Sequence, residues 1–194
     1  MKKLLLIFIF FILNNNYSYS IEPDVFVQST VNRASQILSK NISKDQKILE
    51  LKNIAKETVD IRGVGFYSLG SARKNLDDNQ KKEYLYLFEN YFLKSFSSRL
   101  AEYTNPEIDV KSKEKLNENY TIVNSVLIAT TERPEVKIDW RIYTKNPNNP
   151  QIRDLIIEGL SLARTQKEEF ASILNSNNGD INALFKTLEK FSNN

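Results

Sequence analysis

Apolar and polar residues alternate with a period of two through much of the second half of the chain. In residues 136–142 every second residue is apolar and the residues between them are charged, which is typical of a strand with one buried face. Further strands are predicted around Ile108, over residues 120–130 and over residues 152–158. Short segments rich in Asn, Glu and Pro separate them, and such segments favour turns. The pattern therefore predicts a four-stranded antiparallel meander.

The first half of the chain has the 3.6-residue period of amphipathic helices. Asp45 is the expected N-cap of the second helix, and Pro106 is expected to end the fourth. After the strands, Ser161 stands where a helix N-cap belongs and opens the first of two final helices. Helices before and after a meander predict an α+β domain with the helices packed on one face of the sheet. The four helices of the first half are predicted over residues 23–41, 45–59, 60–70 and 79–103.

The first 20 residues have the pattern of a cleavable signal peptide. Two lysines precede a ten-residue apolar run, and Ser18 and Ser20 are small residues at the positions that a signal peptidase reads. The run is too short to span a bilayer as a helix. We expect cleavage after Ser20, leaving one domain over residues 21–194. The signal contains two lysines and no acidic residue, so the formal net charge of +3 falls to +1.

Composition excludes several kinds of chemistry. The chain has no cysteine, no histidine and one methionine, the first residue, so disulfides, thiol catalysis and the usual zinc, copper and haem ligands are absent. The pair Asp77 and Asp78 precedes a helix and is better explained as a cap than as a catalytic pair. Serine catalysis lacks its customary histidine base, although Lys/Tyr-based or Asp-based alternatives stay open. We expect no enzyme activity, no metal and no cofactor.

Three lysines, Lys111, Lys113 and Lys115, occupy alternate positions near the first strand, with acidic residues between them. A basic row on a strand is usually a solvated edge that discourages pairing with other chains. The expected charge of the processed chain is close to neutral, whereas a nucleic-acid-binding domain is normally basic. Nucleic acid is therefore not an expected partner.

Three motifs in the C-terminal third together resemble a known family. They read D-W-R-I from Asp139, D-L-I-I-E-G-L-S-L from Asp154, and E-F at Phe170. Their series is similar to the C-terminal signature of the MlaC (toluene-tolerance) family, the periplasmic phospholipid carriers of the Mla lipid-asymmetry pathway. Asp60 and Gly70 also match a family motif, in which Arg and Ala usually stand at the positions of the two glycines 63 and 65.

The resemblance implies a periplasmic protein that carries phospholipids between the inner and outer membranes. It also implies two membrane partners, an inner-membrane MCE-domain ABC transporter complex and an outer-membrane lipoprotein–porin complex, and an apolar lipid cavity between sheet and helices with phospholipid as cargo. The residues expected to line that cavity are Phe66, Tyr67, Phe88, Tyr91, Phe92, Phe96, Ile122, Val126, Ile128, Val136, Ile138, Trp140, Leu155, Ile157 and Phe170.

Gly63 and Gly65 lie in the weakest predicted helix and lower its propensity by about 1 kcal/mol each relative to Ala. We therefore predict that this segment moves to open the cavity. Two other classes stay open. One is a small-ligand binder or enzyme with a nuclear-transport-factor-like α+β fold, for which Asp139 or Asp154 would supply a buried carboxylate, although their neighbours favour surface ion pairs. The other is a periplasmic chaperone without a cavity.

Overall fold

The computed structural model describes residues 20–103 and 106–193. The signal peptide predicted for residues 1–20 lies outside the described residues, apart from Ser20. Within the two described ranges, no helix has both the length and the apolar character needed to cross a membrane. The elements in chain order are α1 (Pro23–Ser39), α2 (Lys44–Thr58), α3 (Ile61–Leu69), the 3-10 helix η1 (Gly70–Lys74), α4 (Asp78–Leu100), β1 (Ile108–Asn117), β2 (Tyr120–Leu127), β3 (Val136–Tyr143), β4 (Gln151–Ile157), β5 (Leu160–Ser161), α5 (Leu162–Ser176) and α6 (Ile181–Asn193).

The strands form one antiparallel sheet in the order β1-β2-β3-β4-β5. The α+β class and the meander are confirmed, but the sheet has five strands rather than the four predicted. Glu158 and Gly159 have φ angles of 49° and 83° and form the tight turn that lets Leu160 pair with Ile157. A strand of only two residues has no alternation to detect, which is why β5 was missed.

The prediction that Ile122, Val126 and Ile128 face the helices is wrong. Val123 and Leu127 point into the core instead, with exposed fractions of 0% and 5%. Both faces of β2 carry apolar residues, so the period of two does not show which face is buried. The inner face also contains a polar residue, a serine, in its middle.

That residue, Ser125, is buried because β3 satisfies its hydroxyl group. The indole Nε1 of Trp140 donates to Ser125 Oγ at 2.8 Å, and Ser125 Oγ donates to the carbonyl of Ile138 at 2.9 Å. Burying a hydroxyl group is tolerated when its hydrogen bonds are made. A polar residue on the inner face of β2 is therefore stable here.

The helices of the first half lie close to their predicted positions, and their caps explain where they begin. The N-cap of α2 is Ser43 rather than the predicted Asp45, because Ser43 and Gln46 form a reciprocal capping box. Asp77 and Gln80 form another at the start of α4, which agrees with the capping role predicted for the acidic pair. Helix α4 ends at Leu100, three residues before the predicted end.

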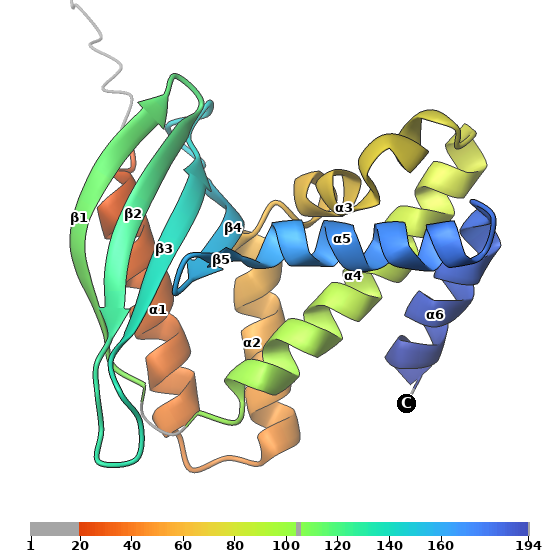
Figure 1. Cartoon of the computed structure of the whole chain (residues 1–194). Helices are drawn as coiled ribbons and strands as arrows, with labels where there is room; N and C mark the ends of the chain where they lie inside the picture. Colours follow the sequence, from red (N-terminus) through yellow and green to blue (C-terminus); the bar gives the residue numbers. More distant parts are fainter. Residues whose placement is uncertain (1–19, 104–105, 194) are drawn as a thin grey trace, which may run out of the picture.

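The helices lie on one side of the sheet and extend away from it (Figure 1). Helix α1 packs along β1 and β2, and α2 packs between α1 and α4. Helices α3, α4, α5 and α6 form a second group, in which α3 contacts α5 and α4 contacts α6. Phe88 and Tyr84 of α4 meet Phe170 of α5 edge-on, with ring centroids 6.1 and 6.5 Å apart. Such aromatic pairs stabilise a core beyond the area they bury.

The two glycines of α3 stand where neighbouring groups approach closely. A Cβ on Gly65 would lie 2.8 Å from the Phe88 ring, and the carbonyl of Gly65 accepts the Tyr84 hydroxyl at 2.8 Å. A Cβ on Gly63 would lie 2.4 Å from Oδ2 of Asp60. Close packing of α3 against α4 and against its own cap therefore explains both glycines without any motion.

Candidate ligand-binding site

An apolar cavity of about 130 Å³ lies between the sheet and the helices. The sheet contributes side chains from the inner faces of β2, β3 and β4, and the helices contribute side chains from α1, α2 and α4. Leu127, Ile138, Trp140, Ile152, Leu155 and Ile157 line it from the sheet, and Val31, Leu38, Leu51, Ile54, Phe96 and Leu100 are among the residues that line it from the helices.

A second cavity, of about 190 Å³, continues the first toward α5. The two cavities share Val59, Phe96, Trp140, Ile152 and Leu155 as lining residues, so they are neighbouring parts of one apolar space. The Phe96 ring stacks on Phe92 with centroids 5.5 Å apart. This stack forms the α4 wall where the two parts meet.

Polar groups border the second cavity where it passes between α4 and α5. The hydroxyl of Tyr91 donates to Oε1 of Gln166 at 2.8 Å, and the amide of Gln166 donates to Glu169 at 2.9 Å. Burial raises the pKa of Tyr91, and the nearby Glu169 carboxylate raises it further, so the phenol stays neutral and keeps its proton to donate. One hydrogen bond thus links α4 to α5 across the cavity rim.

The structure brings together about half of the residues that were expected to line the cavity. Phe88 and Phe170 lie in the aromatic core instead, and Tyr67 lines a third, more polar cavity. Phe66 and Val136 line none of the three cavities, and neither do the outward residues of β2 named above. The expected residues that line the apolar space are Tyr91, Phe92, Phe96, Ile138, Trp140, Leu155 and Ile157.

Several lining residues were missed by sequence reasoning. The α1 and α2 side chains, such as Val31 and Leu51, are buried at helical spacing, a signal that identifies them as interior but does not distinguish a cavity wall from a filled core. Leu127 was missed because the wrong face of β2 was chosen.

Asp154 is buried rather than at the surface, with an exposed fraction of 5%, so the expectation of a surface ion pair is wrong for this residue. It lines the second apolar cavity and the third cavity. Its Oδ1 accepts the amide of Ala163 at 3.0 Å, and its Oδ2 accepts the hydroxyl of Ser161 at 2.6 Å. Arg141 lies 3.5 Å from the same Oδ2. These partners give Asp154 a structural role as a second cap of α5, and Asp139, bonded to Asn124, lines none of the cavities.

Arg153 lies at the boundary between the apolar space and the third cavity. Its Nε donates to Asp60 Oδ2 at 2.7 Å, its Nη1 donates to the hydroxyl of Tyr120 at 2.8 Å, and its guanidinium lies 4.0 Å from the ring centroid of Tyr143. Burial alone would lower the pKa of Arg153, yet Asp60 and Tyr120 together raise it. The guanidinium is therefore held as a charged, fully engaged group beside an apolar space.

This arrangement can enclose an apolar ligand, and it shows no set of groups arranged for a reaction among the described residues. The apolar space can remove a hydrocarbon group from water. Of the two carboxylates that line it, Asp154 caps α5 and Glu169 accepts from Gln166. Among the described residues, no group of three or more acidic side chains could hold a metal ion.

Comparison with known proteins agrees with this geometry. The family model described as MlaC protein matches residues 28–190, and the chain therefore belongs to the MlaC family. The fold is similar to that of a phospholipid-binding protein from Ralstonia solanacearum, whose structure was solved in complex with a phospholipid. The two chains are 17% identical with a TM-score of 0.74, and the match covers 89% of this chain and 97% of the other.

Proposed function

We propose that this protein is a carrier that binds a phospholipid with its acyl chains in the apolar space between sheet and helices. The observation that carries the proposal is the continuity of that space, because the two cavities share five lining residues from β3, β4, α4 and the segment after α2. Membership of the MlaC family and the fold shared with a phospholipid-binding protein support the same conclusion.

The energetic reason for such a carrier is the insolubility of the tails. Exposing a methylene group to water costs about 0.8 kcal/mol, so one acyl chain of about sixteen carbons costs on the order of 12 kcal/mol. Burying a phosphate without partners would also be expensive. A carrier must therefore enclose the tails while leaving the head group at a polar rim or beside specific donors.

The two parts of the apolar space, of about 190 and 130 Å³, together reach only the lower end of the roughly 300–1,000 Å³ of small-molecule sites, which is small for a lipid with two acyl chains. We infer that the space widens when tails enter. The best place for it to widen is the rim between α4 and α5, where Tyr91 donates to Gln166, because breaking that contact would open the rim while Phe170 stays packed on Tyr84 and Phe88. The α3 segment, whose glycines are tightly packed, is less well suited to be the moving part than its low helix propensity suggested.

The compartment and the partners are part of the same proposal. The N-terminal pattern favours export, and the family resemblance favours the periplasm, exchange with an inner-membrane MCE-domain transporter complex and an outer-membrane lipoprotein–porin complex, and a role in outer-membrane lipid asymmetry. Deep burial of the tails would make spontaneous release slow, so these partners would act by opening the cavity. Under this proposal the protein is not an enzyme and needs no cofactor.

The test is to purify the exported protein and extract it with organic solvent. The carrier function predicts phospholipid at a molar ratio near one, identified by mass spectrometry, and transfer of labelled phospholipid from donor to acceptor vesicles. Protein that contains no lipid and takes up none from vesicles would overturn the proposal. An empty protein that suppresses the aggregation of unfolded proteins would instead favour the chaperone alternative.

A further inference from the structure

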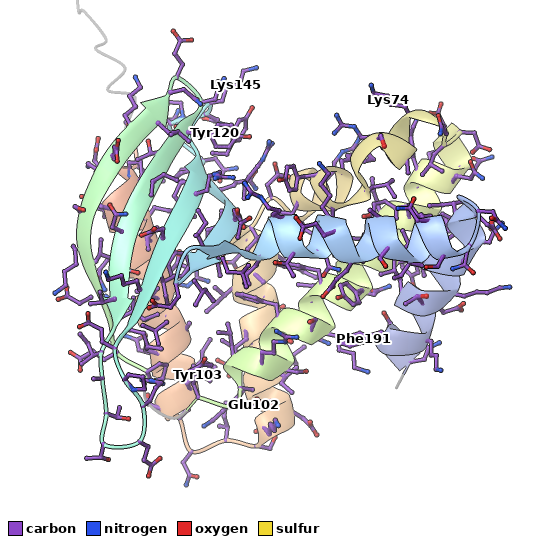
Figure 2. All side chains as sticks on the ribbon, viewed as in Figure 1. Lys74, Glu102, Tyr103, Tyr120, Lys145 and Phe191 are labelled. Carbon is purple, nitrogen blue, oxygen red and sulfur yellow. The ribbon has the colours of Figure 1, made fainter. Side chains whose placement is uncertain are left out.

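The third cavity adjoins the apolar space but has a different lining. Its volume is about 290 Å³, and it is bounded by α3, the start of α5 and residues of β1 to β4. Val64, Arg153, Asp154 and Ala163 line both this cavity and the second apolar cavity. A single ligand can therefore place an apolar part in one and a polar part in the other. In Figure 2, Tyr120, which lines the third cavity, lies near one end of the sheet, and Tyr103, which lines the first apolar cavity, lies near the other end.

Two arginines line the third cavity, and they differ in how well they are paired. Arg153 uses its guanidinium on Asp60 and Tyr120. Arg141 makes one long hydrogen bond, from Nη1 to Oδ2 of Asp154 at 3.5 Å, and that oxygen also accepts the hydroxyl of Ser161 at 2.6 Å. The Nε of Arg141 is buried and has no hydrogen-bond partner among the described residues. The Arg141 side chain as a whole is 35% exposed and lines the cavity, so guanidinium N–H groups that Asp154 does not use can donate to an anionic ligand there.

Two helix N-termini add positive potential at the same place. Helix α3 begins after Asp60 and α5 begins after Ser161, and Gly63 and Ala163 from their first turns line the cavity. The amides of these two residues already donate to the side chains of Asp60 and Asp154. The helices therefore contribute their dipole field, which favours an anion, while the hydrogen bonds to a ligand must come from side chains.

Two tyrosine hydroxyls supply further donors. The hydroxyl of Tyr120 accepts from Arg153, which leaves its own proton available to donate. Tyr67 is 41% exposed and lines the cavity, and the ammonium of Lys167 lies 5.4 Å from its ring centroid. The guanidinium and phenol groups that line the cavity match a phosphate, whose oxygens accept several charge-assisted hydrogen bonds, and Lys167 adds positive charge beside Tyr67.

We propose that this cavity binds a phosphate oxyanion, with Arg141 as the principal ligand and Tyr67 and Tyr120 as additional donors. The lipid form of this inference rests on the proposed carrier function: the phosphate is then that of the head group, and the acyl chains occupy the adjoining apolar space. The same groups would also bind free inorganic phosphate, so the two sources need separate experiments.

The first experiment presents the purified protein with vesicles of dioleoylphosphatidylglycerol and dioleoylglycerol in equal amounts. After re-isolation by gel filtration, mass spectrometry gives the ratio of the two bound lipids, which have the same tails and differ in the phosphate head group. Arg141→Gln should lower this ratio by about tenfold, while total lipid stays similar. Arg33→Gln is the matched control, because it removes the same charge from an exposed α1 residue that pairs with Glu57 and lines none of the cavities.

The second experiment titrates inorganic phosphate into the same three proteins by calorimetry. Phosphate binding that is lost in Arg141→Gln and kept in Arg33→Gln, together with an unchanged lipid ratio, would identify free phosphate as the ligand. An Arg141→Gln protein with a wild-type lipid ratio and wild-type phosphate binding would overturn the inference. If the wild-type protein takes up neither lipid, the carrier function fails, and the phosphate titration alone then decides whether the anion site exists.

Arg141→Lys keeps the test available if the Gln variant does not fold. Lysine retains the positive charge beside Asp154 but loses the planar fork and the Nε donor. Relative to wild-type protein, the variant should lower the lipid ratio or the phosphate affinity by a factor smaller than the tenfold expected for Arg141→Gln. Equal behaviour of Arg141→Lys and the wild-type protein in both experiments would show that the planar guanidinium is not the principal phosphate ligand.

Discussion

The guanidinium of Arg153 donates to Oδ2 of Asp60, with Nε 2.7 Å and Nη2 2.5 Å from that oxygen. The other carboxylate oxygen of Asp60 accepts the amide of Gly63 at 2.8 Å, and the backbone amide of Asp60 donates to the carbonyl of Ile152 at 3.0 Å. One residue therefore caps α3 and joins it to β4. The position of α3 relative to the sheet, and with it one wall of two cavities, depends on this contact.

Replacing Asp60 should destabilise the protein in two distinguishable steps. Asp60→Asn keeps a side-chain acceptor for the cap but loses the charge opposite Arg153, and should cost about 1–2 kcal/mol of unfolding free energy. Asp60→Ala also loses the cap and should cost about 2–4 kcal/mol. Urea denaturation measures both. Asp78→Ala is the control, because the Asp78 side chain is 90% exposed and its ion pair with Lys81, at 3.4 Å, lies at the surface. If Asp78→Ala lowered the unfolding free energy as much as Asp60→Ala, the contact between Asp60 and Arg153 would not stabilise the protein more than a surface ion pair does.

The glycines of α3 give a prediction opposite in sign to that of helix propensity. Gly→Ala in an exposed helix gains about 1 kcal/mol, but a Cβ at position 65 would lie 2.8 Å from the Phe88 ring and one at position 63 would lie 2.9 Å from Nε of Arg153. Overpacking of this kind costs about 1–3 kcal/mol. We expect Gly63→Ala and Gly65→Ala each to lower the urea midpoint. Ser172→Ala, at an exposed position of α5, should raise it slightly, and increased stability of both glycine variants would contradict the packing account.

These glycines also show where sequence reasoning reaches its limit. The periods of 2 and 3.6 located the α+β order, the meander and most helix starts, because those features depend on local alternation and capping residues. The contact of Gly65 with Phe88, and that of Asp60 with Arg153, join residues far apart in the chain, and a single sequence contains no signal for them. The glycines suggested flexibility, whereas the structure shows them closely packed; movement of α3 stays a prediction.

The cavity lining was predictable only where a strand or helix had one apolar face. Ile138 and Trp140 alternate with charged residues, so their inward direction followed from the sequence. On β2 both faces carry apolar residues, and the inner face also includes Ser125. Which face is buried depends on the hydrogen bonds of Ser125 with Trp140 and Ile138 of β3, and the sequence does not reveal them. Asp154 has charged neighbours typical of a surface position, yet the start of α5 buries it.

The lysine row of β1 predicts a dependence of stability on pH. The hydrogen bond from Lys113 holds the pKa of Asp24 below its ordinary value of 3.8. A lowered pKa in the folded state stabilises the protein above pH 3.8 and ceases to do so as the pH falls through the lowered value. In Lys113→Met the pKa of Asp24, followed by carboxyl ¹³C NMR, should rise toward 3.8.

The stability difference between wild-type protein and Lys113→Met should therefore be largest near neutral pH and should shrink as the pH falls below 3.8. Salt should also reduce it, because the pair is near the surface. Lys115→Met, on the same strand, is the control and should leave the titration of Asp24 unchanged. A pKa of Asp24 that stays low in Lys113→Met would assign the shift to the N-terminus of α1 instead of the lysine.

Filling the apolar space should displace lipid without preventing folding. Ile138 lines the first cavity, whereas Val126, on the neighbouring strand β2, points to the opposite face of the sheet. Tryptophan at position 138 would occupy space that acyl chains need, and its strain in the ligand-free protein should stay within about 1–3 kcal/mol. Tryptophan at position 126 adds the same bulk outside the cavity.

We expect Ile138→Trp to be folded, as judged by a cooperative urea transition, and to retain much less phospholipid than wild-type protein after purification. Val126→Trp should retain the wild-type amount. Leu155→Trp, on β4 and in both apolar cavities, provides a second test if Ile138→Trp does not fold. Wild-type lipid content in folded Ile138→Trp and Leu155→Trp proteins would place the acyl chains elsewhere, because the space could then be filled at both positions without effect on lipid binding. A loss of lipid in Val126→Trp alone would place them on the outer face of the sheet.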